Sequence, residues 1–225
     1  MINYKEQIKV IGLDMDQTLY PKSSEIDEAI QIYIYQKIAQ HKNCNLNEAE
    51  KLFKDLYKEG RGLSGGKTLI RLGIPNAREV VQEALENADI AKFLQPNSEV
   101  LQLLKDLKKK YHNVDLITSS NKKNMTIKLR KMSIPVNIFF HIITGSDNVS
   151  KSDGRAYELW MSFYENFKPE QFLYIGDKVS SDYVMPKKMG IQTILVNIKD
   201  RDDTTKCPQL SSLIEIKSLL FPPKN

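Results

Sequence analysis

The sequence predicts an α/β fold, a doubly wound parallel sheet into which a helical segment is inserted. Five short apolar runs have the length of strands, and they are residues 8–13, 114–118, 138–143, 172–176 and 193–197. These runs are rich in Ile, Val, Leu and Phe and do not alternate cleanly with polar residues, which is typical of strands covered on both faces. Helical patterns separate the runs from residue 98 onward, and alternating strands and helices indicate a parallel sheet.

Three helical patterns lie between the later runs. Residues 98–111 place Leu103 and Leu107 on one apolar face, as an amphipathic helix does. Residues 124–132 and 154–167 supply the other two helices. Each pattern stands between two predicted strands, so each helix is expected to connect parallel neighbours in the sheet.

The long interval between the first and second runs has a different character. Residues 21–93 contain no convincing strand and carry three helical patterns instead. Ser24 and the acid three residues later form a capping-box start for the first helix. Asn47 can cap a second helix that ends at Gly60, and residues 77–89 form the third.

The length of the chain permits two domains. A chain of 225 residues can bury a sizeable interior and can hold a core with a smaller insert. We therefore expect a core of residues 1–20 and 94–225 and a helical cap of residues 21–93.

Charge, cysteines and apolar runs restrict the partners. The chain has 33 Lys and Arg against 28 Asp and Glu, and its lysine cluster at 105–110 is typical of a solvated helix face rather than a nucleic-acid surface. No run approaches the ~18 apolar residues of a membrane span, and the first residues lack the apolar core of a signal peptide. Cys44 and Cys207 fit neither a metal spacing nor a disulfide framework. We expect a cytoplasmic monomer or homodimer that binds no nucleic-acid polymer and no membrane.

Polar residues follow the predicted strands at the ends where a doubly wound sheet binds its ligands. They are Asp14 and Asp16 after the first strand, Thr118, Ser119 and Ser120 after the second, Lys151 after the third, and Asp177 and Asp182 after the fourth. A single Asp at a strand end is usually a turn residue or a helix cap, and a single lysine is usually on the surface. These separate explanations do not account for the whole set, because the order and spacing of its residues place all of them at the same edge of the predicted sheet.

The chemistry of this set favours a phosphate ester and a divalent cation. Four carboxylates close together repel one another, and a divalent cation relieves that repulsion. Oxygen ligands without His or Cys favour Mg²⁺, which also takes phosphate oxygens as ligands. Lys151 and Thr118 supply the charge and the hydrogen bond that suit a phosphate dianion. One carboxylate can attack phosphorus to give an aspartyl-phosphate, and another can move protons.

These residues resemble the four motifs of the haloacid dehalogenase superfamily over nearly the full length of the chain. "DMDQT" at 14–18 matches its Asp-x-Asp-x-Thr motif, and Thr118 in "LITSS" matches the Thr or Ser that closes a strand. Lys151 matches the lysine of the third motif, and "GDKVSSD" at 176–182 matches the Gly-Asp and later Asp of the fourth. The first and fourth motifs are specific, whereas the second and third are identified by position.

The resemblance implies roles at the phosphate and at the cofactor, Mg²⁺. Asp14 would be the nucleophile, and Asp16 would protonate the leaving group and then activate water. Thr118 and Lys151 would hold the phosphoryl group. The metal ligands would be Asp14, the Asp16 backbone carbonyl and Asp177, with Asp182 as a ligand directly or through water. Residues 21–93 stand where the family inserts its helical cap, a lid that excludes water and selects the substrate.

Two departures from the family pattern affect individual positions. Ser119 stands where Asn is frequent, so the residue of the second motif can be Thr118, Ser119 or Ser120. Thr118 is favoured because it closes the apolar run, and Ser119 is a further substrate-binding candidate. Ser152 and Gly154 replace frequent prolines after the lysine of the third motif, which makes that loop less rigid.

The expected reaction is hydrolysis of a small phosphorylated metabolite. Family members that act on carbon–halogen bonds lack an acid two residues after the nucleophile, whereas Asp16 is present here. "DMDQTLYPKS" resembles the pyrimidine 5′-nucleotidases, which share its Leu-Tyr, so a nucleoside monophosphate is the first candidate substrate. The alternatives are a sugar-phosphate mutase, which shields the aspartyl-phosphate from water, and a non-catalytic binding protein of this fold.

The stretch "GRGLSGGKT" at 60–68 looks like a Walker A loop but does not meet its spacing. The motif needs Gly at the position that Arg61 occupies, and it must follow a strand rather than a helix. We expect either an inter-helix turn or a cap loop that faces the substrate. In the second case Arg61 and Lys67 provide polar contacts, and Arg61 contributes to specificity.

Overall fold

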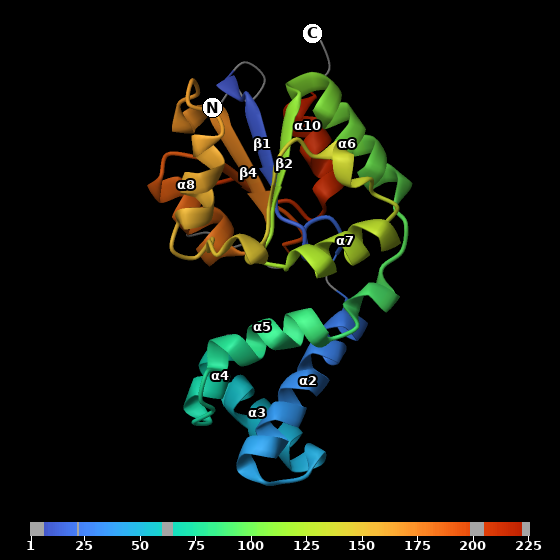
Figure 1. The fold of residues 1–225 in the computed structure, drawn as a ribbon, viewed down its shortest axis with the longest axis vertical. Coiled ribbons are helices and arrows are strands. Elements are labelled where there is room, and N and C mark those ends of the chain that lie inside the picture. Colours follow the sequence, from blue (N-terminus) through green and yellow to red (C-terminus); the bar gives the residue numbers. More distant parts are fainter. Residues whose placement is uncertain (1–6, 22, 60–64, 199–204, 222–225) are drawn as a thin grey trace. The chain divides into compact units, whose positions relative to one another are not determined.

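The structure, a computed structural model, describes residues 7–21, 23–59, 65–198 and 205–221. The chain is built as two compact units (Figure 1), one formed by residues 1–22 and 94–225 and the other by Ser23–Phe93. They are called the core unit and the cap unit below. The cap unit begins at Ser23, whereas the sequence led us to expect the boundary at residue 21.

The core unit contains a five-stranded parallel sheet. Its strands are β1 (Val10–Leu13), β2 (Asn113–Ile117), β3 (Ile142–Ile143), β4 (Phe172–Gly176) and β5 (Gln192–Leu195). They lie in the order β3-β2-β1-β4-β5. The chain therefore moves outward from β1 to β3 and then returns to the other side of β1, which is the winding of a doubly wound sheet.

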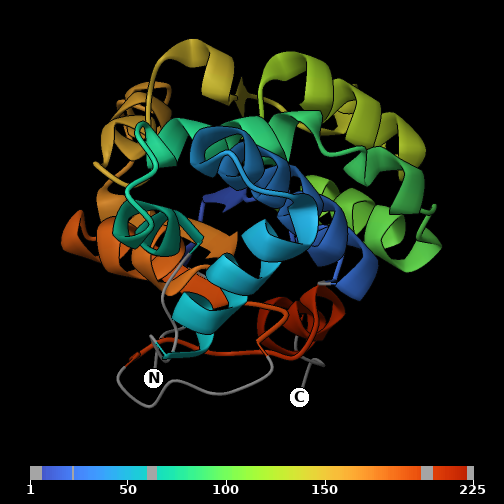
Figure 2. The ribbon, with the colours of Figure 1, turned by 90° about the horizontal axis from the view of Figure 1, so that it is seen from below.

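Helices cover both faces of this sheet. They are α6 (Ser98–Tyr111), α7 (Lys122–Lys131), α8 (Arg155–Ser162), α9 (Met185–Lys188) and α10 (Ile216–Leu220). Two perpendicular views agree that α8 lies on the opposite side of the sheet from α6 and α10 (Figure 1, Figure 2). The parallel order and the two helical layers confirm the predicted fold class.

The third strand is shorter than its apolar run predicts. Only Ile142–Ile143 pair in the sheet, whereas the run spans residues 138–143. Pro135 precedes a 3₁₀ turn over Val136–Ile138. Because proline fixes its φ angle and favours such a turn, the chain enters the strand only after the turn is complete.

The cap unit is built from helices that pack around a core of their own. They are α2 (Ser24–Lys42), α3 (Leu46–Glu59), α4 (Gly65–Arg71) and α5 (Ala77–Asn87), followed by a 3₁₀ segment, Ile90–Phe93. Ile38, Phe53, Leu69 and Ala84 come from four different helices, and all four are buried in one cluster. The sequence predicted three of these helices and missed α4.

Two predicted helix caps were wrong by one or two residues. Ser23, not Ser24, caps α2 through its hydroxyl. Asn45, not Asn47, caps α3, since its side chain accepts the Glu48 N–H at 3.0 Å and the Glu48 carboxylate accepts the Asn45 N–H at 3.1 Å. An acid follows both Asn residues at the capping-box spacing. The sequence pattern therefore does not decide between the two registers.

Gly12, in the centre of β1, lies against the ring of Trp160 from α8. A Cβ atom at Gly12 would lie 2.7 Å from that ring, closer than packed atoms approach. The ring is fixed, because its Nε1 donates to the fully buried Asp115 carboxylate at 2.7 Å. A side chain at this position therefore has no room.

Gly12→Ala is expected to lower the free energy of unfolding by about 1–3 kcal/mol, the usual cost of overpacking a core. Urea unfolding followed by circular dichroism measures the change. Gly66→Ala on α4 is the matched control, because its Cβ would meet only one atom, at 3.9 Å. The control is expected to be neutral or slightly stabilising. Equal stability of Gly12→Ala and the unchanged chain would contradict the packing argument.

Candidate active site

The polar residues that follow the strands of the core unit lie at one edge of its sheet. Asp14 directly follows the central strand β1, Thr118 follows β2 and Asp177 follows β4. The register pairs the last residue of β1 with residues near the ends of both neighbours. The strand order reverses between β1 and β4, which is the place where open α/β sheets bind ligands.

Lys151 connects the carboxylates of this edge. Its Nζ lies 2.7 Å from Asp14 Oδ1 and 3.0 Å from Asp182 Oδ1, and it donates to the Tyr174 hydroxyl at 3.2 Å. All four residues are buried. Asp14, Asp177 and Asp182 each offer one carboxylate oxygen, and these three oxygens lie within 4.8 Å of one another. The structure thus brings together groups that are far apart in the sequence.

Asp182 owes its position to a local irregularity of the chain. It lies on a π-helix, Val179–Val184, and its Oδ2 accepts the backbone N–H groups of Asp177 and Lys178 at 3.1 and 3.0 Å. A Cβ on Gly176 would lie 2.5 Å from this side chain, so only glycine fits there. The Gly-Asp and later Asp of the sequence motif therefore form one packed turn, in which Asp182 organises the loop that carries Asp177.

The pKa of Asp14 is raised to about 7. Burial is the largest cause, the charge of Lys151 opposes it, and Asp182, Asp16 and Asp177 raise the pKa further. The pKa of Asp182 is lowered instead, because Lys151 and the Lys178 N–H together outweigh the effect of burial. Asp182 thus has donors in addition to Lys151 that favour its ionised form.

The cluster of Asp14, Asp177 and Asp182 fits a hard divalent cation. Its donors are all carboxylate oxygens, and no His or Cys joins them within the described ranges. Burial, and after it the neighbouring carboxylates, raise the pKa of Asp14 against the opposing charge of Lys151. Hard divalent cations bind carboxylate oxygens whose negative charge is not neutralised by neighbouring groups.

Asp16 lies outside this cluster and has its own set of donors. Its Oδ1 accepts from Lys128 Nζ at 2.5 Å and from the Tyr20 hydroxyl at 2.7 Å. Its Oδ2 accepts from the Ser120 hydroxyl at 2.7 Å and from the Thr118 hydroxyl at 3.4 Å. Burial raises the pKa of Asp16, but Lys128 and the hydrogen bonds outweigh it and bring the pKa below its usual range.

The loop that carries Asp16 is held from the end of the last strand. Gln17 has a φ of 60°, which non-glycine residues rarely adopt. Asn197 follows β5 and donates through Nδ2 to the Gln17 carbonyl at 2.7 Å and to the Thr18 carbonyl at 3.2 Å. These contacts stabilise the unusual backbone and therefore help fix the direction of the Asp16 side chain.

The structure places the remaining predicted site residues in different surroundings. Thr118 and Ser120 are buried and contact Asp16, whereas Ser119 is exposed. Arg61 lies outside the described residues. Lys67 lies on α4, and the helical elements flanking residues 60–64 argue against a Walker A loop, which needs a preceding strand.

Sequence reasoning missed Lys128 and Tyr20 as partners of Asp16. Lys128 lies on the buried stripe of α7 with Met125 and Leu129, and Met132, which caps the helix at its C-terminus, continues that stripe. These four residues recur at the spacing i, i+3, i+4, i+7 of an apolar helix face. A lysine within such a stripe is the signal that could have identified it.

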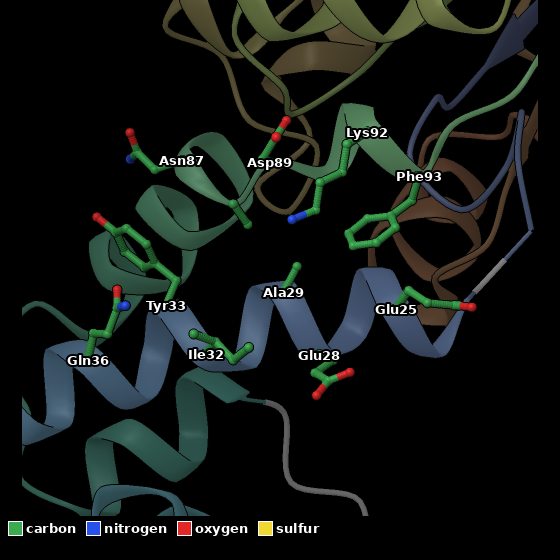
Figure 3. Close-up of a pocket in the computed structure, with 11 residues that line it drawn as sticks. Glu25, Glu28, Ala29, Ile32, Tyr33, Gln36, Asn87, Asp89, Lys92 and Phe93 are labelled. Atoms are coloured by element: carbon green, nitrogen blue, oxygen red, sulfur yellow. The ribbon is translucent and has the colours of Figure 1, made fainter. Parts of the chain in front are cut away.

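The cap unit has a cavity of about 330 Å³ between α2 and the segment that follows α5 (Figure 3). Ala29 and Ile32 from α2 and Phe93 form apolar walls. The ammonium of Lys92 extends beside the Phe93 ring, 4.9 Å from its centroid. All residues of this cavity belong to the cap unit.

None of the helices within the described ranges is both long and apolar enough to cross a bilayer.

Comparison with known proteins identifies the family. The model of haloacid dehalogenase-like hydrolases matches residues 11–196. A glyceraldehyde 3-phosphate phosphatase of Methanopyrus kandleri is 26% identical over 199 residues, which cover 84% of this chain and 84% of the relative.

Solved structures show the same fold. A HAD phosphatase from Thermococcus onnurineus aligns with a TM-score of 0.64 at 19% identity, covering 97% of this chain and 100% of the other. An L-2-haloacid dehalogenase from Xanthobacter autotrophicus aligns with a TM-score of 0.58 at 13% identity, covering 94% of this chain and 98% of the other. One fold thus serves phosphatases and dehalogenases, and it does not by itself select the reaction. The family model, however, spans most of the chain and every candidate residue from Asp14 to Asp182, so the chain belongs to the haloacid dehalogenase-like hydrolases.

Proposed function

We propose that this hydrolase is a Mg²⁺-dependent phosphomonoesterase that acts on a small phosphorylated metabolite through an aspartyl-phosphate. The observation that carries the proposal is the buried Lys151 ammonium, placed 2.7 Å from Asp14 and 3.0 Å from Asp182 beside a third carboxylate. A nucleophilic carboxylate needs nearby positive charge to approach a phosphate dianion, and this arrangement supplies it. Asp16, two residues after Asp14, supplies the acid that the family's dehalogenases lack.

In the first step an oxygen of Asp14 attacks phosphorus while the bond from phosphorus to the ester oxygen breaks. Lys151 and the Thr118 hydroxyl bind the oxygens of the transferring phosphoryl group, with Ser119 as a further candidate contact. Asp16 gives a proton to the departing ester oxygen, so the product leaves as an alcohol.

In the second step water attacks the aspartyl-phosphate. Asp16, now a carboxylate, accepts the proton of the water, and the water oxygen displaces Asp14 from phosphorus. The step releases phosphate and returns to Asp16 the proton that the first step requires. A phosphate dianion beside Asp16 raises the pKa of its carboxyl, which favours the protonated form needed for the first step.

Mg²⁺ is the cofactor we propose for the carboxylate cluster. Asp14, Asp177 and the Asp16 backbone carbonyl would hold it, and Asp182 would act directly or through water. When bound, the ion would offset the negative charge of the phosphoryl group and of Asp14. The lack of nitrogen and sulfur donors in the described cluster supports Mg²⁺ over softer metals.

Two substrate classes follow from different observations. The Leu19-Tyr20 pair after the first motif supports a nucleoside monophosphate. The relative from Methanopyrus kandleri, named for glyceraldehyde 3-phosphate, supports a small sugar phosphate. We propose that the cap, residues 21–93, selects between such substrates and that Arg61 contributes to this specificity.

There are two alternative functions. The chain could be a sugar-phosphate mutase that uses the same residues, or a non-catalytic binding protein of the same fold. A mutase retains Asp14 and Asp16 but passes the phosphoryl group to a second substrate instead of to water. A binding protein has no need of a nucleophile, so the intact set around Asp14 argues against it. We further propose a monomer or homodimer that binds no nucleic-acid polymer and no membrane. A cytoplasmic location is proposed as well, and the thiols of Cys44 and Cys207, which form no disulfide, support it.

Release of inorganic phosphate from a panel of nucleoside monophosphates and small sugar phosphates tests the proposal. We expect release with Mg²⁺ that is focused on one substrate class and is lost with EDTA. Release that appears only with a sugar bisphosphate activator would indicate a mutase. If no substrate released phosphate although Mg²⁺ bound, the hydrolase proposal would be wrong and a binding protein would remain.

A further inference from the structure

Lys128 is a buried lysine that contacts the active-site edge from a helix outside the four motifs. Its side chain is only 4% exposed, and its Nζ lies 2.5 Å from Asp16 Oδ1 and 3.0 Å from the Ser120 hydroxyl. Lys151, by contrast, pairs with Asp14 and Asp182. The two carboxylates of the first motif therefore have separate ammonium partners.

The position of Lys128 is costly for folding. Its neighbours on the buried stripe of α7 are Met125, Leu129 and Met132, so an apolar side chain would suit the stripe. Burying an ammonium is unfavourable, and an ion pair offsets this only where its geometry is good and hydrogen bonds satisfy the charge. Replacing such pairs with apolar residues is often neutral or stabilising. Packing alone therefore does not account for a lysine at residue 128.

The contacts of Lys128 converge on the carboxylate that handles protons in the proposed reaction. Asp16 keeps a quarter of its side chain exposed, whereas Lys128 behind it is almost fully covered. Ser120 donates to Asp16 and accepts from Lys128, so the three side chains form a closed triangle. A partly exposed carboxylate in a loop has several rotamers, and this triangle selects one of them.

We propose that Lys128 is a positioning residue that holds the Asp16 carboxyl where it exchanges a proton with the ester oxygen and with water. The inference rests on the proposed function. Lys128 is assigned no contact with the phosphate, because its ammonium faces the Asp16 carboxylate and the Ser120 hydroxyl. Its effect is exerted through Asp16 alone.

Two substrates that differ strongly in their need for the proton of Asp16 test this role. The glycerol of glycerol 3-phosphate departs as an unstable alkoxide unless its ester oxygen is protonated, whereas the nitrophenol of 4-nitrophenyl phosphate departs as a stable phenolate. The ratio kcat/KM reports the steps up to formation of the aspartyl-phosphate, so it isolates the step in which Asp16 acts as an acid. The substitution to study is Lys128→Met, which keeps the length of the side chain and removes its charge.

We expect Lys128→Met to lower kcat/KM by about 30-fold or more for glycerol 3-phosphate and by less than about threefold for 4-nitrophenyl phosphate, since acid catalysis is worth about 10²–10⁴-fold. Lys128→Arg keeps the charge and is expected to restore part of the loss. Lys131→Met, at an exposed position of the same helix, is the control and is expected to behave as the unchanged chain. Equal losses on the two substrates, or a rise in KM with kcat unchanged, would overturn the inference.

Failure of the inference and failure of the proposed function give different results. If the unchanged chain with Mg²⁺ releases phosphate from neither substrate, the proposed function fails and the inference falls with it. If the unchanged chain is active and the two losses are equal, only the inference fails. Should Lys128→Met not fold, Ser120→Ala provides a second test, because it opens the same triangle without leaving a buried charge unpaired. It is expected to shift the ratio of the two kcat/KM values in the same direction, and an unchanged ratio would overturn the inference.

Discussion

Asp14→Asn is expected to lower the rate of phosphate release by at least about 10³-fold while the chain stays folded. The substitution keeps the shape of the side chain but replaces the attacking carboxylate with an amide, which is a far weaker nucleophile. Phosphate-monoester hydrolysis without a catalyst is among the slowest known reactions, so no background pathway replaces the lost step. The rate is measured as free phosphate with Mg²⁺ and the best substrate of the panel.

The controls for this experiment address folding and chemical reversion. Asp106→Asn on α6 makes the same chemical change at a carboxylate whose hydrogen-bond partner is the neighbouring Gln102. It is expected to retain full activity. Mass spectrometry excludes deamidation of the introduced amide back to a carboxylate. A rate within about tenfold of the unchanged chain would show that Asp14 is not the nucleophile.

The sheet and the edge that carries the site could be predicted because each rests on a short-range pattern. Apolar runs of strand length mark β1 and β4, and Asp14 and Asp177 follow them directly, so sheet topology alone brings these carboxylates together. Family resemblance then supplied their expected roles.

The surroundings of Asp16 could not be predicted in the same way. Its donors Tyr20, Ser120 and Lys128 depend on side-chain directions, which no periodicity encodes. The π-helix that positions Asp182 is likewise a local irregularity, and its only trace in the sequence is the five-residue gap after Asp177. Patterns thus located the carboxylates, but only the packed structure showed which ammonium each one meets.

The same Asp14→Asn substitution is expected to stabilise the chain in metal-free buffer at pH 8. The pKa of Asp14 is about 7 in the folded chain against 3.8 for an unperturbed carboxyl, so folding opposes its ionisation. Below pH 3.8 the carboxyl is protonated in both states and has no effect on stability. Between the two pKa values only the unfolded state is ionised, and stability falls as the pH rises. Above pH 7 folding bears the full free-energy cost of burying the ionised Asp14 carboxylate. The neutral amide of Asn at this position avoids that cost.

The expected gain from Asp14→Asn is about 4 kcal/mol in the free energy of unfolding at pH 8, from about 1.4 kcal/mol for each pKa unit. At pH 5 the gain falls to about 1–2 kcal/mol, because most of the folded population then carries a proton on Asp14. Urea unfolding at both pH values in EDTA measures the difference, and Asp106→Asn serves again as the control. Added Mg²⁺ is expected to stabilise the unchanged chain more than the variant, since it favours the ionised Asp14. A gain that is equal at the two pH values would contradict the raised pKa, because only titration of Asp14 makes the effect depend on pH.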